Sequence, residues 1–445
     1  MIASAKIEDF FAEMKASDSL VSVEGRLTSI GPKGLIATGL SHIAGLEDFV
    51  SIKGKSGEIK AEVVFVDKQQ IIAKPLDSDT QVYLGDTVRA MGKPRFFPTH
   101  EWKGRLINAL AEPLDGKGPL PMGGRRISYA GKPVSAVDRA PINKKLLTGV
   151  KAIDVFTPLC YGQRMGIFAG SGVGKSTLMG MLAASPGFDC AVISLVGERG
   201  REVTEFIHEV LGNTLSKSVV IIATGDESAS MRKRAALLAT SLAEWFRDEG
   251  QNVLLMMDSL TRYAQALREL ALAGGEPPVS RGFPPSVFSA LPQILERSGP
   301  GLHGSGTITG IFSVLVEGDN HNEPVADAVR GVLDGHIILD RRIGGQGRFP
   351  AVDLLQSISR LSQKAHSPEQ AKTASDLRKL VHRYEDSRDL RALGGYQPGK
   401  DIDLDRSLSI VPRLYSTLTQ TPADGPAPDA FASIAEALKA PAPAR

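Results

Sequence analysis

A glycine-rich stretch that ends in a lysine and two hydroxyl residues is the strongest chemical signal in this chain. It reads AGSGVGKST over residues 169–177, after an apolar run that predicts a strand and before a pattern that predicts a helix. In that context the glycines turn backbone N–H groups toward phosphate oxygens, and the helix N-terminus favours negative charge. We therefore expect a phosphate-binding loop (P-loop) formed by Gly170, Ser171, Gly172, Val173, Gly174, Lys175, Ser176 and Thr177.

Two side chains of this loop predict how a nucleotide would be held. The Lys175 ammonium would reach the β- and γ-phosphates, and the Ser176 hydroxyl would bind Mg²⁺. The strict pattern G-x-x-x-x-G-K-[ST] requires glycine where this chain has Ala169, but the rest of the pattern is intact. The expected ligand is a nucleoside di- or triphosphate together with Mg²⁺.

Two carboxylates at the ends of apolar runs complete the expected site. Asp258 ends the run NVLLMMD, where it would hold Mg²⁺ directly or through water, and it could also cap the next helix. Glu198 ends the run CAVISLVGE and would activate water if its strand neighbours the P-loop strand; otherwise it is a solvated charge. With Lys175, these residues predict a Mg²⁺-dependent nucleotide hydrolase.

The elements that must position these residues follow from hydrophobic periodicity. From residue 149 onward, strand-like runs alternate with helical patterns, which predicts a parallel sheet with helices on both faces. Short alternating runs between residues 20 and 93 predict a small β-barrel. The expected segments are an amphipathic stretch (1–19), the barrel (20–95), an ATPase domain (96–365), a helical domain (366–420) and a loosely ordered Ala/Pro-rich tail around one helix near residues 431–439 (421–445).

Composition excludes several classes of protein. The 445 residues are 42% hydrophobic and 23% charged, which excludes wholesale disorder. A net charge of +2 gives no general electrostatic reason to bind nucleic acid or an anionic membrane. The two cysteines cannot form a disulfide framework, and the apolar runs fall short of the ~20 residues that span a bilayer. We expect a cytoplasmic location.

Several segments resemble the catalytic core of the F1/V1-type rotary ATPase superfamily: GSGVGKST, LVGERGREV, LLMMDSLTRYAQA, PPVSRGFPPSVFSALPQILERSG and PAVDLLQSISR. The run from GRLINALAEPLDGKGP through TGVKAIDVFTPLCYGQRMGIFAGSGVGKST is most similar to the flagellar export ATPases of type III secretion, the flagellum-specific ATP synthase family. The likeness extends over residues 20–415. It implies a multi-domain α/β chain in which a RecA-like P-loop domain with a mainly parallel sheet lies between an N-terminal β-barrel and a C-terminal helical domain.

The resemblance also implies residue roles. Glu198 matches the catalytic glutamate that activates water, and Arg199 matches an arginine near the γ-phosphate. Arg360 matches an arginine finger supplied to the neighbouring subunit's nucleotide, although it could instead pair with a nearby carboxylate. Phe349 occupies the position of an aromatic ring against adenine, although it could be a core residue, and Tyr396 is a second expected adenine contact.

The resemblance implies ATP or ADP with Mg²⁺ as the bound ligands. The function that it implies is ATP hydrolysis at the subunit interfaces of a homohexamer that energises flagellar protein export. A stator protein would bind the N-terminal stretch, which could otherwise pack on its own domain. A coiled-coil stalk would touch the loop at residues 274–286, which could otherwise be an ordinary connection. Export-gate membrane proteins and chaperone–substrate complexes are further expected partners, at the inner-membrane export apparatus.

Alternative functions share the core residues. The chain could be the catalytic subunit of a virulence-type secretion ATPase or of an F1/V1-type ATP synthase, or a structural ring subunit without turnover, against which Glu198 argues. An RNA-translocating hexameric motor would need aromatic side chains for base stacking. Between residues 21 and 90 the aromatic residues are Phe49, Phe65 and Tyr83, so we expect an oligomerisation collar and no nucleic acid partner.

Overall fold

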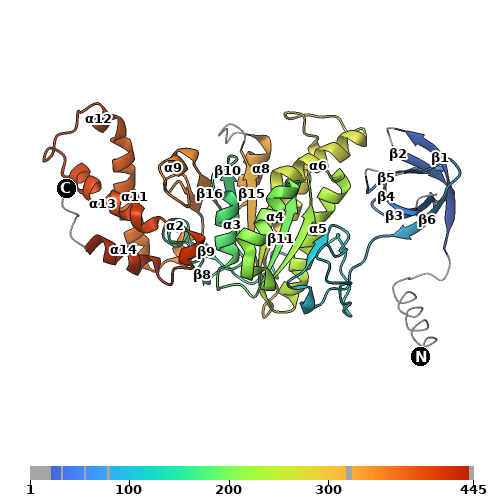
Figure 1. Cartoon of the computed structure of the whole chain (residues 1–445), viewed down its shortest axis with the longest axis horizontal. Coiled ribbons are helices and arrows are strands. Elements are labelled where there is room, and N and C mark those ends of the chain that lie inside the picture. Colours follow the sequence, from blue (N-terminus) through green and yellow to red (C-terminus); the bar gives the residue numbers. More distant parts are fainter. Residues whose placement is uncertain (1–21, 32–33, 55–56, 78–80, 317–322, 440–445) are drawn as a thin grey trace. The chain divides into compact units, whose positions relative to one another are not determined.

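The computed structural model describes residues 22–439 except 32–33, 55–56, 78–80 and 317–322. The predicted amphipathic stretch at residues 1–19 therefore lies outside the described residues. The described chain divides into two compact units: residues up to Arg95 with Ala273–Gly275, and all other residues (Figure 1). In this part of the chain, no helix is long and apolar enough to cross a membrane.

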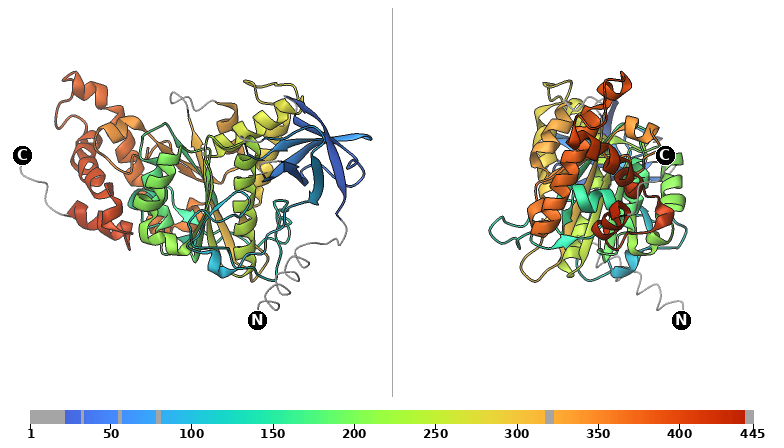
Figure 2. Two further views of the ribbon diagram at one scale, coloured as in Figure 1. Left: turned by 45° about the vertical axis from the view of Figure 1, so that its right-hand side comes forward. Right: turned by 90° about the vertical axis from the view of Figure 1, so that its left-hand side faces the viewer.

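The first unit is a closed barrel with the strand order β1-β2-β5-β4-β3-β6, drawn in blue in Figure 2. Buried and exposed residues alternate along its short strands, as expected when one face of each strand meets a core. Leu27, Val50 and Ile71 are among the core residues. The predicted barrel is confirmed, with strands β1 (Glu24–Gly31), β2 (Gly34–Thr38), β3 (Phe49–Gly54), β4 (Gly57–Val66), β5 (Gln70–Pro75) and β6 (Thr87–Gly92).

The second unit is built on a nine-stranded sheet with the order β17-β16-β10-β15-β13-β11-β12-β7, in which β14 pairs with β15. All neighbours are parallel except the pairs β14–β15 and β16–β17. The central strands are almost wholly apolar because helices cover both of their faces. The predicted mainly parallel sheet is confirmed, with strands β7 (Leu106–Asn108), β10 (Arg164–Ala169), β11 (Cys190–Val196), β12 (Ser218–Ala223), β13 (Asn252–Asp258), β14 (Gly299–Pro300), β15 (Thr307–Leu315), β16 (Gly335–Leu339) and β17 (Ile358–Ser359).

Helices pack against this sheet, and β8 (Lys145–Leu146) and β9 (Leu159–Cys160) form a separate strand pair. The helical pattern of residues 203–211 folds as the second half of α4 followed by a π-helical turn, Phe206–Leu211. This turn brings Val210 against Gly180 of α3, where no β-carbon would fit. The helices in this part are α2 (Lys151–Phe156), α3 (Lys175–Ala183), α4 (Gly200–Glu205), α5 (Ala229–Asp248), α6 (Leu260–Ala273), α7 (Pro285–Glu296), α8 (Pro324–Val332) and α9 (Arg341–Gly345).

The C-terminal part is helical, as predicted. Ser367 and Gln370 form a capping box that fixes the start of α11. The helix expected near residues 431–439 is present as Ala430–Lys439. Its residues Ala430 and Ile434 are buried in the same hydrophobic cluster as the sheet, because their spacing places them on one helix face, so this helix is packed more closely than the composition predicts. The domain limits stay predictions. The helices are α10 (Ser362–Ala365), α11 (Pro368–Asp386), α12 (Arg388–Ala392), α13 (Ile402–Leu418) and α14 (Ala430–Lys439).

Candidate nucleotide site

The predicted P-loop lies between the end of β10 and the start of α3. Gly172 and Gly174 have φ angles of 76° and 87°, a backbone region that other residues rarely adopt. Gly174 directly precedes the first residue of α3, so the loop turns at the positive end of the helix dipole. The backbone thus has the form that an anion-binding loop needs.

Lys175, Glu198 and Asp258 lie together at the carboxyl edge of the sheet. The Lys175 ammonium forms an ion pair with Asp258, and its Nζ lies 3.5 Å from Oε1 of Glu198. Ser313 on β15 donates its hydroxyl to Oδ1 of Asp258 at 2.6 Å and fixes this carboxylate. All three charged side chains are largely buried, so Glu198 is not a solvated charge. Ser259, rather than Asp258, accepts a hydrogen bond from the first turn of α6, at 3.2 Å from the Arg262 amide.

Burial sets the electrostatics of this cluster. It raises the pKa of Glu198 to about 7; Lys175 opposes this shift, while Asp258 and Glu202 add to it. Burial also disfavours the charge on Lys175, but Asp258 and Glu198 outweigh it, so the pKa of Lys175 lies above its ordinary value. The lysine therefore stays charged, and the glutamate can take up or release a proton near neutral pH.

The cluster opens into a cavity of about 720 Å³ that the P-loop lines, except for Val173. Arg199, Arg262 and Arg341 also line it. Sequence reasoning missed the last two. Arg262 stands on the first turn of α6 after Asp258, and its buried Nε has no hydrogen-bond partner among the residues described. Arg341 follows β16, the parallel neighbour of β10, and donates to the Ser171 carbonyl at 3.2 Å.

The donor set fits a magnesium ion that enters with a nucleotide. Ser176 and Asp258 both line the cavity and offer the oxygen ligands that Mg²⁺ prefers. Among the described residues, no group of three or more His, Cys, Asp or Glu side chains could hold a metal alone. Phosphate oxygens and water would have to supply the remaining ligands. Within the part of the chain that the structure describes, Glu198 Oε1 is buried without a hydrogen-bond partner, which leaves an acceptor for a water molecule.

The two predicted adenine contacts lie in different places. A β-carbon on Gly174 would lie 3.6 Å from the Phe349 ring, which is 42% exposed and so is not a core side chain. The Phe349 carbonyl accepts the Gln420 amide at 2.8 Å, and Gln420 lines a second cavity of about 380 Å³ that begins at Thr177. Tyr396 instead donates its hydroxyl to Asp405 at 2.6 Å and lines a cavity without P-loop residues.

The two predicted arginines differ as well. The Arg199 side chain is 83% exposed at the cavity wall, 3.5 Å from Glu202. Arg360 follows β17, is exposed, and does not line the cavity of its own chain. Within the described residues, its guanidinium has no hydrogen-bond or ion-pair partner, although its backbone amide donates to the Asp334 carbonyl at 2.9 Å.

Comparisons with known proteins agree with this geometry. The nucleotide-binding domain of the ATP synthase alpha/beta family matches residues 149–359, and the C-terminal domain of the type III secretion ATPase EscN matches residues 366–440. The flagellum-specific ATP synthase of Rhizobium meliloti (strain 1021) is 52% identical over 423 residues, which cover 95% of this chain and 91% of the relative. That of Bacillus subtilis (strain 168) is 47% identical over 371 residues, 83% of this chain and 84% of the relative.

Two further similarities concern type III secretion. The SPI-2 type 3 secretion system ATPase of Salmonella typhimurium (strain LT2) is 44% identical over 369 residues, 82% of this chain and 84% of the relative. The structure of the assembled ATPase EscN from enteropathogenic E. coli aligns with a TM-score of 0.85 and 38% identity over 93% of this chain and all of that chain. The predicted resemblance is confirmed: the chain belongs to the flagellum-specific ATP synthase family and is a nucleotide-binding ATPase.

Proposed function

We propose that this chain hydrolyses MgATP at the interfaces of a homohexameric ring and thereby energises flagellar protein export. The observation that carries the proposal is the convergence of Lys175, Glu198 and Asp258 in one buried cluster, while Arg360 stays exposed away from that cavity. Three flagellar relatives are 52%, 51% and 47% identical to this chain, the SPI-2 ATPase is 44% identical, and four further flagellar relatives are 40–44% identical. The three highest identities favour the flagellar over the virulence-type reading.

The chain's own groups account for phosphate binding. The P-loop amides and the Lys175 ammonium would hold the β- and γ-phosphates, so Lys175 must exchange its contact with Asp258 for the nucleotide. Ser176 and Asp258 would hold Mg²⁺, which, when bound, offsets phosphate charge. Arg262 is placed to donate its unpaired buried Nε to a phosphate oxygen.

Glu198 would act as the general base. Its pKa of about 7 lets it accept a proton from the attacking water near neutral pH. Its Oε1 lies 3.5 Å from the Lys175 ammonium but has no hydrogen-bond partner within the described residues, so it can accept the hydrogen bond that orients this water. Arg199, exposed at the cavity wall, would approach the γ-phosphate.

The base of the nucleotide would lie toward the second cavity. Thr177 lines both cavities, so a nucleotide whose phosphates occupy the P-loop can extend past it. Phe349, with its ring beside Gly174 and its carbonyl bonded to Gln420, offers a flat face for adenine.

Arg360 would complete the site of a neighbouring copy. A guanidinium lent across an interface stabilises charge on the transferring phosphoryl group only when the ring is assembled. This proposal is supported by the exposure of Arg360 and by the absence, within the described residues, of a partner for its guanidinium.

Activity measured against assembly tests the proposal. Specific ATPase activity should rise with protein concentration and follow the mass fraction of hexamer in the same samples. Arg360→Ala should form hexamers that bind ATP but hydrolyse it about 10³–10⁵-fold more slowly. Arg406→Ala, an exposed arginine on α13, should behave as wild type. Equal specific activity in monomer and hexamer, or a normal kcat for Arg360→Ala, would refute interface catalysis.

Partners follow from the same family. EscN has also been solved in complex with its central stalk EscO. The EscN chain of that complex aligns with 93% of this chain, at 36% identity and a TM-score of 0.84. We propose that the loop at 274–286 contacts a coiled-coil stalk and that residues 1–19 bind a stator protein. Export-gate proteins and chaperone–substrate complexes would meet the ring at the cytoplasmic face of the inner membrane. Unchanged stator affinity after deletion of residues 1–18 would exclude the stator contact.

A further inference from the structure

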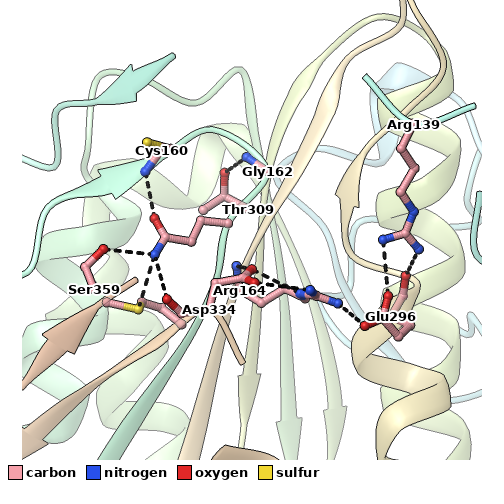
Figure 3. A network of polar contacts seen from close by, with 10 residues as sticks. Arg139, Cys160, Gly162, Arg164, Glu296, Thr309, Asp334 and Ser359 are labelled. Atoms are coloured by element: carbon pink, nitrogen blue, oxygen red, sulfur yellow. Dashed lines mark hydrogen bonds and ion pairs between the residues drawn. The ribbon is translucent and has the colours of Figure 1, made fainter. Parts of the chain in front are cut away.

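A buried glutamine lies at the amino end of β10, opposite the P-loop end. The Gln163 side chain is fully buried and bonds to three segments of the chain. Its Oε1 accepts the Cys160 amide at 2.9 Å, and its Nε2 donates to Oγ of Ser359 at 3.1 Å and to the Asp334 carbonyl at 3.3 Å. Figure 3 shows Cys160, Ser359 and Asp334 gathered around this point.

These contacts converge on the residue before Arg360 and on Arg360 itself. The Asp334 carbonyl that accepts from Gln163 also accepts the Arg360 amide, at 2.9 Å. The Ser359 hydroxyl donates to the Pro158 carbonyl at 2.7 Å. The Gln163 side chain therefore holds both the Ser359 hydroxyl and the Asp334 carbonyl to which the Arg360 amide is bonded.

An ion-pair network holds Asp334 in place (Figure 3). Arg164 approaches both carboxylate oxygens of Asp334, at 3.1 Å and 3.2 Å, and its backbone amide donates to the same carboxylate at 2.9 Å. The Arg164 guanidinium also pairs with Glu296, which Arg139 contacts at 3.2 Å. The positive charges of Arg139 and Arg164 thus balance the negative charges of Glu296 and Asp334. Because the Asp334 side chain is bonded on both oxygens, its backbone carbonyl has little freedom to move.

We propose that Gln163 is a positioning residue that holds Arg360 in the orientation needed at the neighbouring subunit's nucleotide. The inference rests on the proposed role of Arg360. Since β10 connects Gln163 to the P-loop over about 20 Å, at about 3.3 Å per residue, Gln163 is remote from the nucleotide of its own chain. Its loss therefore impairs the site next door while its own P-loop stays intact.

A complementation experiment separates this role from a general structural one. Gln163→Met keeps the volume of the side chain but removes its hydrogen bonds, and we expect a kcat about 10–100-fold lower, because a displacement near 1 Å costs about that much. The KM for ATP should stay within about twofold. Gln251→Met, a half-buried glutamine bonded to His100, is the matched control and should behave as wild type.

The decisive measurement mixes each variant with excess Lys175→Ala chains, which lack a working P-loop but keep Arg360. Turnover per intact P-loop is compared with that of wild type in the same excess. In this mixture the turnover of Gln163→Met should come within about twofold of wild type, because its P-loop then receives Arg360 from a Lys175→Ala chain in which Gln163 is in place. A deficit that persists in the mixture would overturn the inference.

Arg360→Ala in the same mixture tests the underlying function separately. If its deficit shrinks and that of Gln163→Met does not, only the inference fails; if the Arg360→Ala deficit persists, the interface function itself fails. Should Gln163→Met not fold, Ser359→Ala removes one of the three contacts and should give a deficit of about threefold that the mixture also corrects. A Ser359→Ala deficit that the mixture leaves unchanged would equally overturn the inference.

Discussion

The two ends of β10 carry opposite kinds of polar chemistry. At the carboxyl end, Glu198 Oε1 and Arg262 Nε are buried beside the P-loop without hydrogen-bond partners among the described residues. At the amino end, both polar atoms of the buried Gln163 side chain are bonded. An unpaired buried polar atom costs free energy, and a ligand that bonds to it removes this cost. The carboxyl end of β10 is therefore suited to bind a ligand, and the amino end to hold segments of the chain in place; we call them the binding end and the holding end.

The cations at the two ends differ in the same way. Lys175 and Arg164 are each placed between two carboxylates. The Arg164 fork engages Asp334 at two nitrogens, which fixes its geometry. Lys175 is a compact charge that can move its ammonium from Asp258 to a phosphate without a change in the backbone.

The largest expected effect is the loss of turnover when the P-loop lysine is removed. Lys175→Ala should lower kcat by about 10³–10⁵-fold, the range for one cation at a transferring phosphoryl group. The fold should remain, because Lys175 serves phosphate rather than the core. Circular dichroism and ATPase assays check both, with Lys379→Ala, an exposed lysine on α11, as the control. Global unfolding of Lys175→Ala would count against this assignment.

The next effect tests the general base. Glu198→Gln should lower kcat by about 10²–10⁴-fold while nucleotide affinity stays near that of wild type, because the change removes proton acceptance and keeps the shape. Glu205→Gln, at a partly exposed position on α4, is the control. Single-turnover hydrolysis and a fluorescent-nucleotide titration measure the two quantities. Equal rates for wild type and Glu198→Gln would reject the role.

A smaller effect appears in the pH profile. Because burial raises the pKa of Glu198 to about 7, the basic form is lost as pH falls through that value. We expect kcat/KM to fall about tenfold per pH unit below pH 7 and to level off above it. The Glu198→Gln profile should lack this limb. A wild-type profile that stays flat down to pH 5 would contradict a base with this pKa.

The smallest expected effects are on the free energy of unfolding. The Thr309 hydroxyl accepts the Gly162 amide at 3.0 Å near the amino end of β10, whereas the buried Ser194 hydroxyl on β11 has no hydrogen-bond partner in the described part of the chain. Thr309→Val should cost about 1–3 kcal/mol of unfolding free energy, because it orphans a buried amide. Ser194→Ala should change it by less than about 1 kcal/mol. Urea unfolding measures both, and equal losses would contradict the contrast.

The sequence predicted the binding end better than the holding end, for physical reasons. Lys175 stands in a motif with a fixed spacing, and Asp258 and Glu198 follow apolar runs whose parallel pairing brings strand ends together. Gln163 stands in a short turn, where no periodicity marks it. Arg341 was missed because the pairing of β16 beside β10 joins strands far apart in the sequence.

Two other expectations show where tertiary contacts decide. Nothing in the sequence near Tyr396 indicates that Asp405 on α13 holds its hydroxyl away from the P-loop. The Ala/Pro-rich composition predicted a loosely ordered tail around one helix. That helix is present, but Ala430 and Ile434 on it are buried in a hydrophobic cluster, which composition alone does not indicate. The barrel and the parallel sheet were predictable because their strands follow simple alternation or continuous apolar runs.

The separation of Arg360 from the cavity of its own chain has a consequence for the cell. On the proposed role of Arg360, a single copy would bind nucleotide but lack the last cation needed to hydrolyse it. Free copies would then accumulate with little consumption of ATP, and hydrolysis would begin where copies assemble.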